Sequence, residues 1–152
     1  GSVPSSMLSR PRLAEGNVDA AAERLVPEGA DMPKKVLVVD DAVFMRNMIR
    51  DIFVGPDFEV VGEATNGVEA VEKFKELTPD LITMDIVMPF RSGIEATREI
   101  RKLDPAVTIV MCSALGQETL VMEAIEAGAN DFIVKPFRQD EVMKVVRKAM
   151  NI

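Results

Sequence analysis

The chain has 152 residues and contains no histidine, no tryptophan and no tyrosine, and its only cysteine is Cys112. Without histidine it lacks the commonest metal ligand and the usual general base, so a bound metal would be held by oxygen atoms, which favours Mg²⁺ over Zn²⁺. One cysteine cannot form an internal disulfide, so we expect a protein of the reducing cytoplasm. No apolar run approaches the ~20 residues that span a bilayer.

Positive charge is also scarce. Lysine and arginine together number 18 against 25 acidic residues, which gives a formal net charge of −7. Nucleic acids and anionic membrane surfaces are bound by basic faces, so we expect neither as a partner and expect protein partners instead. The sequence does contain 47% hydrophobic and 28% charged residues, which is typical of a globular protein of one domain.

Residues 1–33 differ in pattern from the rest of the chain. Their Gly-Ser start resembles a cloning scar, and four prolines interrupt any long element. A short helical pattern follows Asn17, but so few turns are marginally stable alone in water. We therefore predict an N-terminal tail over residues 1–33 that is mostly disordered or tag-derived, and a domain over residues 34–152.

From residue 34 onward, five apolar runs alternate with five helical periodicities. This alternation predicts an α/β domain whose parallel sheet is covered by helices on both faces. The first, third and fourth runs are almost wholly apolar, as in central strands, whereas Glu59 and Glu63 in and beside the second run suit an edge strand. The strand-like runs are residues 36–39, 58–61, 81–84, 107–111 and 132–134, and the helical patterns cover residues 44–52, 68–74, 94–100, 120–125 and 142–149.

Chemically active side chains follow these strands. The carboxyl ends of parallel strands lie at one edge of a sheet, so we expect these side chains to converge there. Carboxylates that face one another repel unless a cation lies among them, and Mg²⁺ takes one or two carboxylates while leaving room for phosphate oxygens. A lysine and a hydroxyl beside them would hold a phosphoryl group. The residues are Asp40, Asp41, Asp85, Ser113 and Lys135.

Each of these residues also has a structural explanation. Asp41 is a suitable N-cap for the helix that follows, Asp85 is a possible loop acid, and Ser113 is a possible helix cap. Lys135 by itself suits a solvated position beside a turn. Taken singly, the structural explanation is as good as the chemical one for Asp41 and better for Asp85, Ser113 and Lys135. The five residues together favour a metal-assisted phosphoryl site.

Four sequence blocks contain these residues and occur in this order: Val-Val-Asp-Asp at 38–41, Thr-Met-Asp-Ile-Val-Met-Pro at 83–89, Met-Cys-Ser-Ala at 111–114 and Asp-Phe-Ile-Val-Lys-Pro-Phe at 131–137. The blocks resemble response-regulator receiver domains, and most closely the stand-alone CheY-type chemotaxis regulators. The resemblance covers residues 34–152. It implies a flavodoxin-like, doubly wound sheet of five strands in the order 2-1-3-4-5 with five helices, an order for which this family is itself a known example.

The resemblance assigns roles at the acidic site. It implies that Asp85 accepts the phosphoryl group. It also implies a bound Mg²⁺. Asp41 and Asp85 would contact the ion directly, Asp40 would contact it through water, and Val87 would contact it through its backbone carbonyl.

The resemblance also assigns a switch. Ser113 would move toward the phosphoryl group, and Lys135 would pair with that group. The peptide bond between Lys135 and Pro136 is expected to be cis. Phe132 would be the aromatic residue that turns inward, although many relatives have tyrosine there, so a partner that contacts the tyrosine hydroxyl would lose that contact. The alternative for Phe132 is a plain core aromatic.

The same resemblance implies partners and a signalling rather than enzymatic role. A phosphohistidine on a histidine kinase would be the donor, and a downstream protein, such as a flagellar motor switch, would bind the fourth helix, fifth strand and fifth helix. A phosphatase is a further expected partner. On that surface we expect Leu120, Met122, Phe132, Met143 and Lys144, although helix periodicity alone would place most of them in the core.

Four other functions remain open at this point. They are a phosphate sink, an adaptor that works without phosphorylation, a receiver fragment of a larger regulator, and a Mg²⁺-dependent phosphatase with an aspartyl-phosphate intermediate. The adaptor would be expected to lack an acid, the hydroxyl or the lysine, and the phosphatase usually has a second acid at the position of Val87. The chain end at Ile152, directly after the last helical pattern, favours a stand-alone protein over a fragment.

Apolar residues near the acceptor predict slow loss of the phosphoryl group. Val87 and Leu115 occupy positions that are often polar in fast-cycling receivers, and apolar side chains cannot orient an attacking water. We expect slow self-dephosphorylation, which a half-life of seconds in the isolated domain would contradict. Phe90, after Pro89, is another departure, and a lone surface aromatic of this kind is interpreted as incidental.

Overall fold

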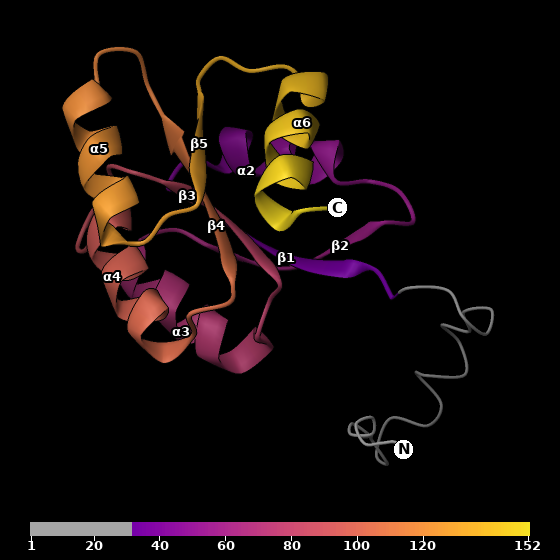
Figure 1. Ribbon diagram of the computed structural model, residues 1–152, viewed down its shortest axis with the longest axis horizontal. Helices are drawn as coiled ribbons and strands as arrows, with labels where there is room; N and C mark the ends of the chain where they lie inside the picture. The colour runs from indigo at the N-terminus through magenta and orange to yellow at the C-terminus, as the bar shows by residue number, and fades with distance from the viewer. Residues whose placement is uncertain (1–31) are drawn as a thin grey trace. The chain divides into compact units, whose positions relative to one another are not determined.

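The computed structural model describes residues 32–152, so the prediction for residues 1–33 lies almost wholly outside the described residues (Figure 1). Five parallel strands form one sheet in the order β2-β1-β3-β4-β5 and alternate with five helices, which confirms the predicted flavodoxin-like fold. The strands are β1 (Lys34–Val39), β2 (Phe58–Ala64), β3 (Leu81–Asp85), β4 (Thr108–Ser113) and β5 (Asp131–Val134). The helices are α2 (Val43–Ile52), α3 (Gly67–Leu77), α4 (Gly93–Leu103), α5 (Glu118–Ala127) and α6 (Gln139–Met150).

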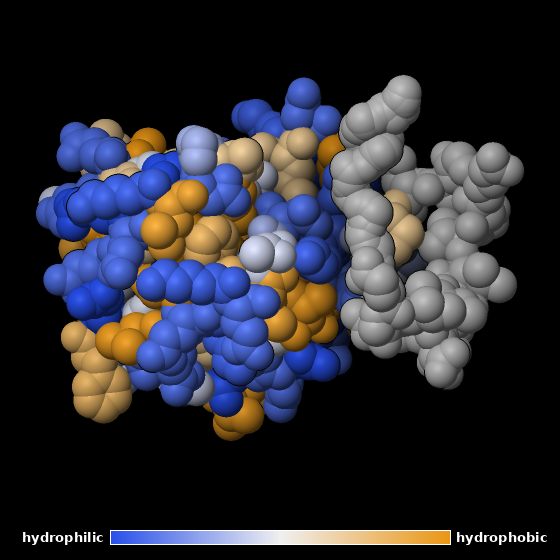
Figure 2. Space-filling model, turned by 90° about the horizontal axis from the view of Figure 1, so that it is seen from below, coloured by the Kyte–Doolittle hydropathy of each residue, from blue (hydrophilic) through white to orange (hydrophobic). Residues whose placement is uncertain are grey.

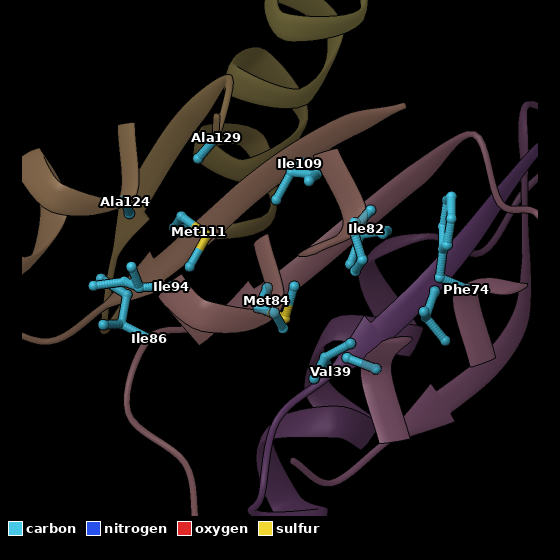
Figure 3. Close-up of a cluster of buried hydrophobic side chains, with 14 of the residues drawn as sticks. Val39, Phe74, Ile82, Met84, Ile86, Ile94, Ile109, Met111, Ala124 and Ala129 are labelled. Carbon is cyan, nitrogen blue, oxygen red and sulfur yellow. The ribbon is translucent and has the colours of Figure 1, made fainter. Parts of the chain in front are cut away.

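Helices cover the sheet on both faces because the central strands are apolar on both sides. One face packs against α3, α4 and α5, through residues such as Phe74, Ile94 and Ala124 (Figure 3). The other face packs against α2 and α6, through Ile49 and Val142 among others. Strands β3 and β4 are buried throughout, and β2 is the half-buried edge strand that the sequence predicted.

The sequence also sets where the helices begin and end. The Asn66 side chain accepts a hydrogen bond from the backbone of Glu69 and caps α3, while Ser92 and Glu95 form a reciprocal capping box at the start of α4. Gly128, with φ +121°, ends α5. The Asn66 and Ser92 caps fix where α3 and α4 begin, and α4 begins in the segment that follows Asp85.

Three apolar residues of the predicted helical patterns are exposed: Phe44, Val68 and Ile125. Phe44 was placed on the apolar face of α2, but its side chain is exposed, whereas Ile49 and Ile52 on the same helix are buried. Phe44 is the second residue of α2, and we attribute its exposure to a first turn that extends past the end of β1, where the sheet offers nothing to pack against. Burial along a helix therefore depends on how far the sheet extends beneath it.

The loops that join β4 to α5 and β5 to α6 lie at the top of Figure 1. The side away from them, seen from below in Figure 2, shows hydrophilic side chains that separate small apolar patches. Within residues 32–152, no helix has both the length and the apolar character to cross a membrane.

Candidate functional site

The five site residues predicted from the sequence lie at one edge of the sheet. Strand register explains this, because Val39 of β1 pairs with Met84 of β3, so Asp40 and Asp85 follow at the same level. Carboxylate oxygens of Asp40, Asp41 and Asp85 lie within 4.8 Å of one another. The Lys135 Nζ lies 3.1 Å from Asp40 Oδ2 and 3.4 Å from Asp85 Oδ1.

Asp40 and Asp41 have different surroundings although they are adjacent in the chain. Asp40 is buried, and its two carboxylate oxygens accept hydrogen bonds from the Ala42 backbone N–H at 2.9 Å and from Lys135 at 3.1 Å. Asp41 is exposed, and the N-cap of α2 is Ala42, with no side-chain capping bond. The structural explanation of Asp41 as an N-cap is therefore wrong, and its carboxylate faces solvent.

The charge of this cluster is unbalanced. Within the described part of the chain, Lys135 is the one cation that forms a salt bridge to Asp40 or Asp85, so three carboxylates face one ammonium. Burial, and next the charge of Asp40, raise the pKa of Asp85 from 3.8 to about 6. Burial opposes the charge on Lys135, but Asp85 and Asp40 outweigh it and raise the pKa of the lysine, so it stays protonated.

This donor set fits a hard divalent cation. All three groups offer carboxylate oxygens, which Mg²⁺ prefers. An added double positive charge would oppose the burial and the repulsion that together raise the pKa of Asp85. Asp41 and Asp85 are the residues that would hold it, because both oxygens of Asp40 already accept hydrogen bonds. Val87 lies two residues beyond Asp85 in the loop between β3 and α4.

Ser113 ends β4, the strand that pairs with β3 and its Asp85, and Phe132 lies on β5, the next strand of the sheet. The Ser113 hydroxyl donates to the Ile133 carbonyl over 3.4 Å, a long and therefore weak hydrogen bond. A cavity of about 270 Å³ is lined by Ser113, Phe132 and neighbouring residues of α5 and β5. Phe132 is partly exposed, which excludes the plain core aromatic, and the Lys135–Pro136 bond is cis, the geometry that the resemblance implied.

Cys112 is the remaining reactive side chain near the cluster. It is fully buried, and burial raises the pKa of its thiol to about 12. The thiol therefore stays protonated and is a poor nucleophile.

Arg46 is a site residue that sequence reasoning missed. It donates to the backbone carbonyl of Asp40 at 2.8 Å and to Glu63 at 2.8 Å, and its side chain is only 13% exposed. Glu63 is fixed in turn by its position in β2 and by Arg50. Arg46 thus holds the Asp40–Asp41 backbone in place. The sequence offered one sign of this role, which is an arginine one turn after Ala42 on the helix that follows the two acids.

We expect Arg46→Gln to weaken Mg²⁺ binding about tenfold, since it releases the backbone that orients Asp41. Isothermal titration calorimetry measures this without a fluorescent label, which suits a chain that lacks tryptophan and tyrosine. Arg50→Gln is the matched control, because Arg50 contacts the same glutamate but not Asp40. Equal Mg²⁺ affinities in the two variants would contradict the positioning role.

The matched family model is that of the response regulator receiver domain, and it covers residues 36–147. This chain belongs to the response regulator receiver family. It is a CheY-type receiver, a signalling protein rather than a catalytic enzyme, and it carries an acidic pocket made of Asp40, Asp41 and Asp85.

Among curated relatives, the receiver is 56% identical over 120 residues to the chemotaxis protein CheY of Bacillus subtilis, covering 79% of this chain and 100% of that protein. It is 58% identical over 117 residues to CheY of Thermotoga maritima, covering 77% and 98% respectively. Among solved structures, the CheX–CheY–BeF₃–Mg complex of Borrelia burgdorferi is 38% identical with a TM-score of 0.73, covering 77% of this chain and 89% of that one.

Proposed function

We propose that this receiver works in a chemotaxis pathway and takes a phosphoryl group from a phosphohistidine of a histidine kinase onto Asp85. The similarity to CheY proteins supports the pathway. The observation that carries the chemistry is the position of Asp85, nearly buried and flanked by Lys135 and two further carboxylates. In this proposal the receiver works in the cytoplasm.

The residues of the chain divide the chemistry among them. A carboxylate oxygen of Asp85 attacks phosphorus, a P–O bond forms, the P–N bond to the donor imidazole breaks, and the imidazole leaves with the bonding electron pair. Lys135 neutralises charge on the phosphoryl oxygens. A Mg²⁺ held by Asp41, Asp85 and the Val87 carbonyl supplies further positive charge when it is bound.

The phosphoryl group then changes the surface formed by α5, β5 and α6. Ser113 can turn toward it at little cost, because its present hydrogen bond is long. The cavity beside Ser113 gives the Phe132 ring room to move inward. Of the expected contact residues, Met122, Phe132 and Lys144 are exposed, while Leu120 and Met143 are half-buried against the core. A downstream protein would bind the changed surface without a hydroxyl contact at residue 132, because phenylalanine has no hydroxyl. A phosphatase would reset the surface.

Intact-mass spectrometry after incubation with acetyl phosphate tests the proposal. We expect one phosphoryl adduct that requires Mg²⁺ and maps to the peptide containing Asp85. An adduct on another residue, or none with either acetyl phosphate or phosphoramidate, would overturn the assignment and favour an adaptor that works without phosphorylation.

Phe132→Trp gives a direct reading of the switch, because it would be the only tryptophan in the chain. The residue is partly exposed in this structure, so we expect long-wavelength emission at first. Phosphorylation should shift the emission to shorter wavelength as the ring enters the cavity. Emission that does not change on full phosphorylation would contradict the inward movement.

A further inference from the structure

Phe90 has an unusual backbone and an unusual exposure. Its φ is +69°, and its side chain is 89% exposed. The Arg91 backbone N–H donates to the Pro89 carbonyl at 2.8 Å, which closes a γ-turn around Phe90. A γ-turn with positive φ is strained, and glycine or asparagine would fit it better than phenylalanine. Both the strained backbone and the exposure of an apolar ring make phenylalanine unfavourable at this position, unless a partner binds the ring.

The residues on either side hold this turn in place. Pro89 has a fixed φ. On the other side, the Arg91 carbonyl accepts a hydrogen bond from the Gly67 backbone N–H at 2.9 Å, and the Arg91 side chain pairs with Glu99 on α4. A Cβ at Gly67 would overlap the Arg91 carbonyl, so the close approach needs a glycine there. Phe90 therefore projects from a turn that is fixed at both ends.

The turn lies in the loop that directly follows Asp85. The Asp85 side chain is only 11% exposed, so a donor has to come in close over this edge of the sheet to reach it. A small phosphodonor can enter without touching the loop. A protein that carries the phosphohistidine cannot, because its surface has to cover the loops around the acceptor.

We propose that Phe90 is an aromatic anchor for the protein phosphodonor, seated in an apolar pocket on that protein. This proposal rests on the proposed function and adds which residue the donor protein recognises. A rigid, exposed aromatic loses little conformational entropy on binding, and such residues dominate protein interfaces. This replaces the interpretation of Phe90 as incidental.

The experiment compares two phosphodonors on wild type, Phe90→Asn and Val54→Asn. Asparagine tolerates positive φ, so Phe90→Asn should fold at least as well as wild type. Val54 is also highly exposed but lies in the loop after α2, at the other end of the sheet from Asp85, and it serves as the matched control. The donors are acetyl phosphate and an autophosphorylated chemotaxis histidine kinase from Thermotoga maritima or Bacillus subtilis, whichever transfers to wild type.

We expect kcat/KM with the kinase to fall at least about tenfold in Phe90→Asn and to stay within about twofold in Val54→Asn, while acetyl phosphate labels all three proteins at similar rates. Unchanged transfer from the kinase would overturn the anchor. So would an equal loss with both donors, because Phe90 would then act on the acceptor site itself. Labelling of wild type by acetyl phosphate but by neither kinase would also overturn the anchor, and labelling by no donor would instead overturn the proposed function.

Discussion

Replacing Asp85 by asparagine is expected to abolish phosphorylation and also to stabilise the metal-free domain by about 2 kcal/mol at pH 8. The first effect follows because an amide cannot accept the phosphoryl group. The second follows because the ionised Asp85 carboxylate is nearly buried beside Asp40, which raises its pKa from 3.8 to about 6. The side chain that gives the site its chemistry is thus a source of instability in the free fold.

The sign of this effect sets its pH dependence. The pKa of Asp85 is higher in the folded than in the unfolded chain, so ionisation costs stability above pH 6 and costs nothing well below the ordinary value of 3.8. A difference of about two in pKa corresponds to at most roughly 3 kcal/mol, and this already includes the attraction of Lys135. The gain from asparagine should therefore vanish as the pH falls to about 4.

Urea unfolding of both proteins in EDTA, at pH 8 and pH 4, measures this difference. Asp41→Asn is the control, since that exposed carboxylate should change stability by no more than about 0.5 kcal/mol. If Asp85→Asn were less stable than wild type at pH 8, the ionised Asp85 carboxylate would not be the source of instability that we infer.

Gly93→Ala is expected to destabilise the domain by about 3 kcal/mol and to weaken Mg²⁺ binding. A Cβ at Gly93 would overlap the backbone carbonyl oxygen of Asp85, and the Gly93 N–H donates to the Ile86 carbonyl at 2.8 Å. The start of α4 therefore lies directly against the backbone of the proposed acceptor. Relief of the overlap has to move either the helix or the strand end that carries Asp85.

Gly62→Ala is the matched control for this substitution. A Cβ there would meet the end of the Leu77 side chain, which can rotate away, so we expect a loss of about 1 kcal/mol or less. Urea unfolding gives the stabilities, and calorimetric titration gives the Mg²⁺ affinities. Similar losses for both variants would show that the contact between Gly93 and Asp85 is not special.

Much of the site could be predicted from the sequence because its parts are local to strand ends. Apolar runs determine which strands are buried, and a parallel arrangement brings the residues after them to one edge. Asp40, Asp85, Ser113 and Lys135 were found in this way. The structure joins Asp40, Asp85 and Lys135 by salt bridges and places Ser113 at the end of the neighbouring strand. The sequence alone could not decide whether Asp41 caps the helix or binds metal, because both roles use aspartate at this position.

The sequence by itself determined the alternation of strands and helices, the two-sided core and the acidic edge, since each depends on periodicity and on residues next to strands. Only the tertiary structure decided the roles of Arg46, Gly93 and Phe90. Arg46 supports the acidic pair by a direct hydrogen bond to the Asp40 carbonyl and is itself held by Glu63 on β2. Gly93 is required by a strand carbonyl that lies against it. The strain at Phe90 is a backbone angle in a turn fixed by contacts with α3 and α4. Two of these contacts, Arg46 with Glu63 and Gly67 with Arg91, join residues far apart in the chain. The others depend on how loops and helix starts meet the strand ends, which hydrophobic periodicity does not encode.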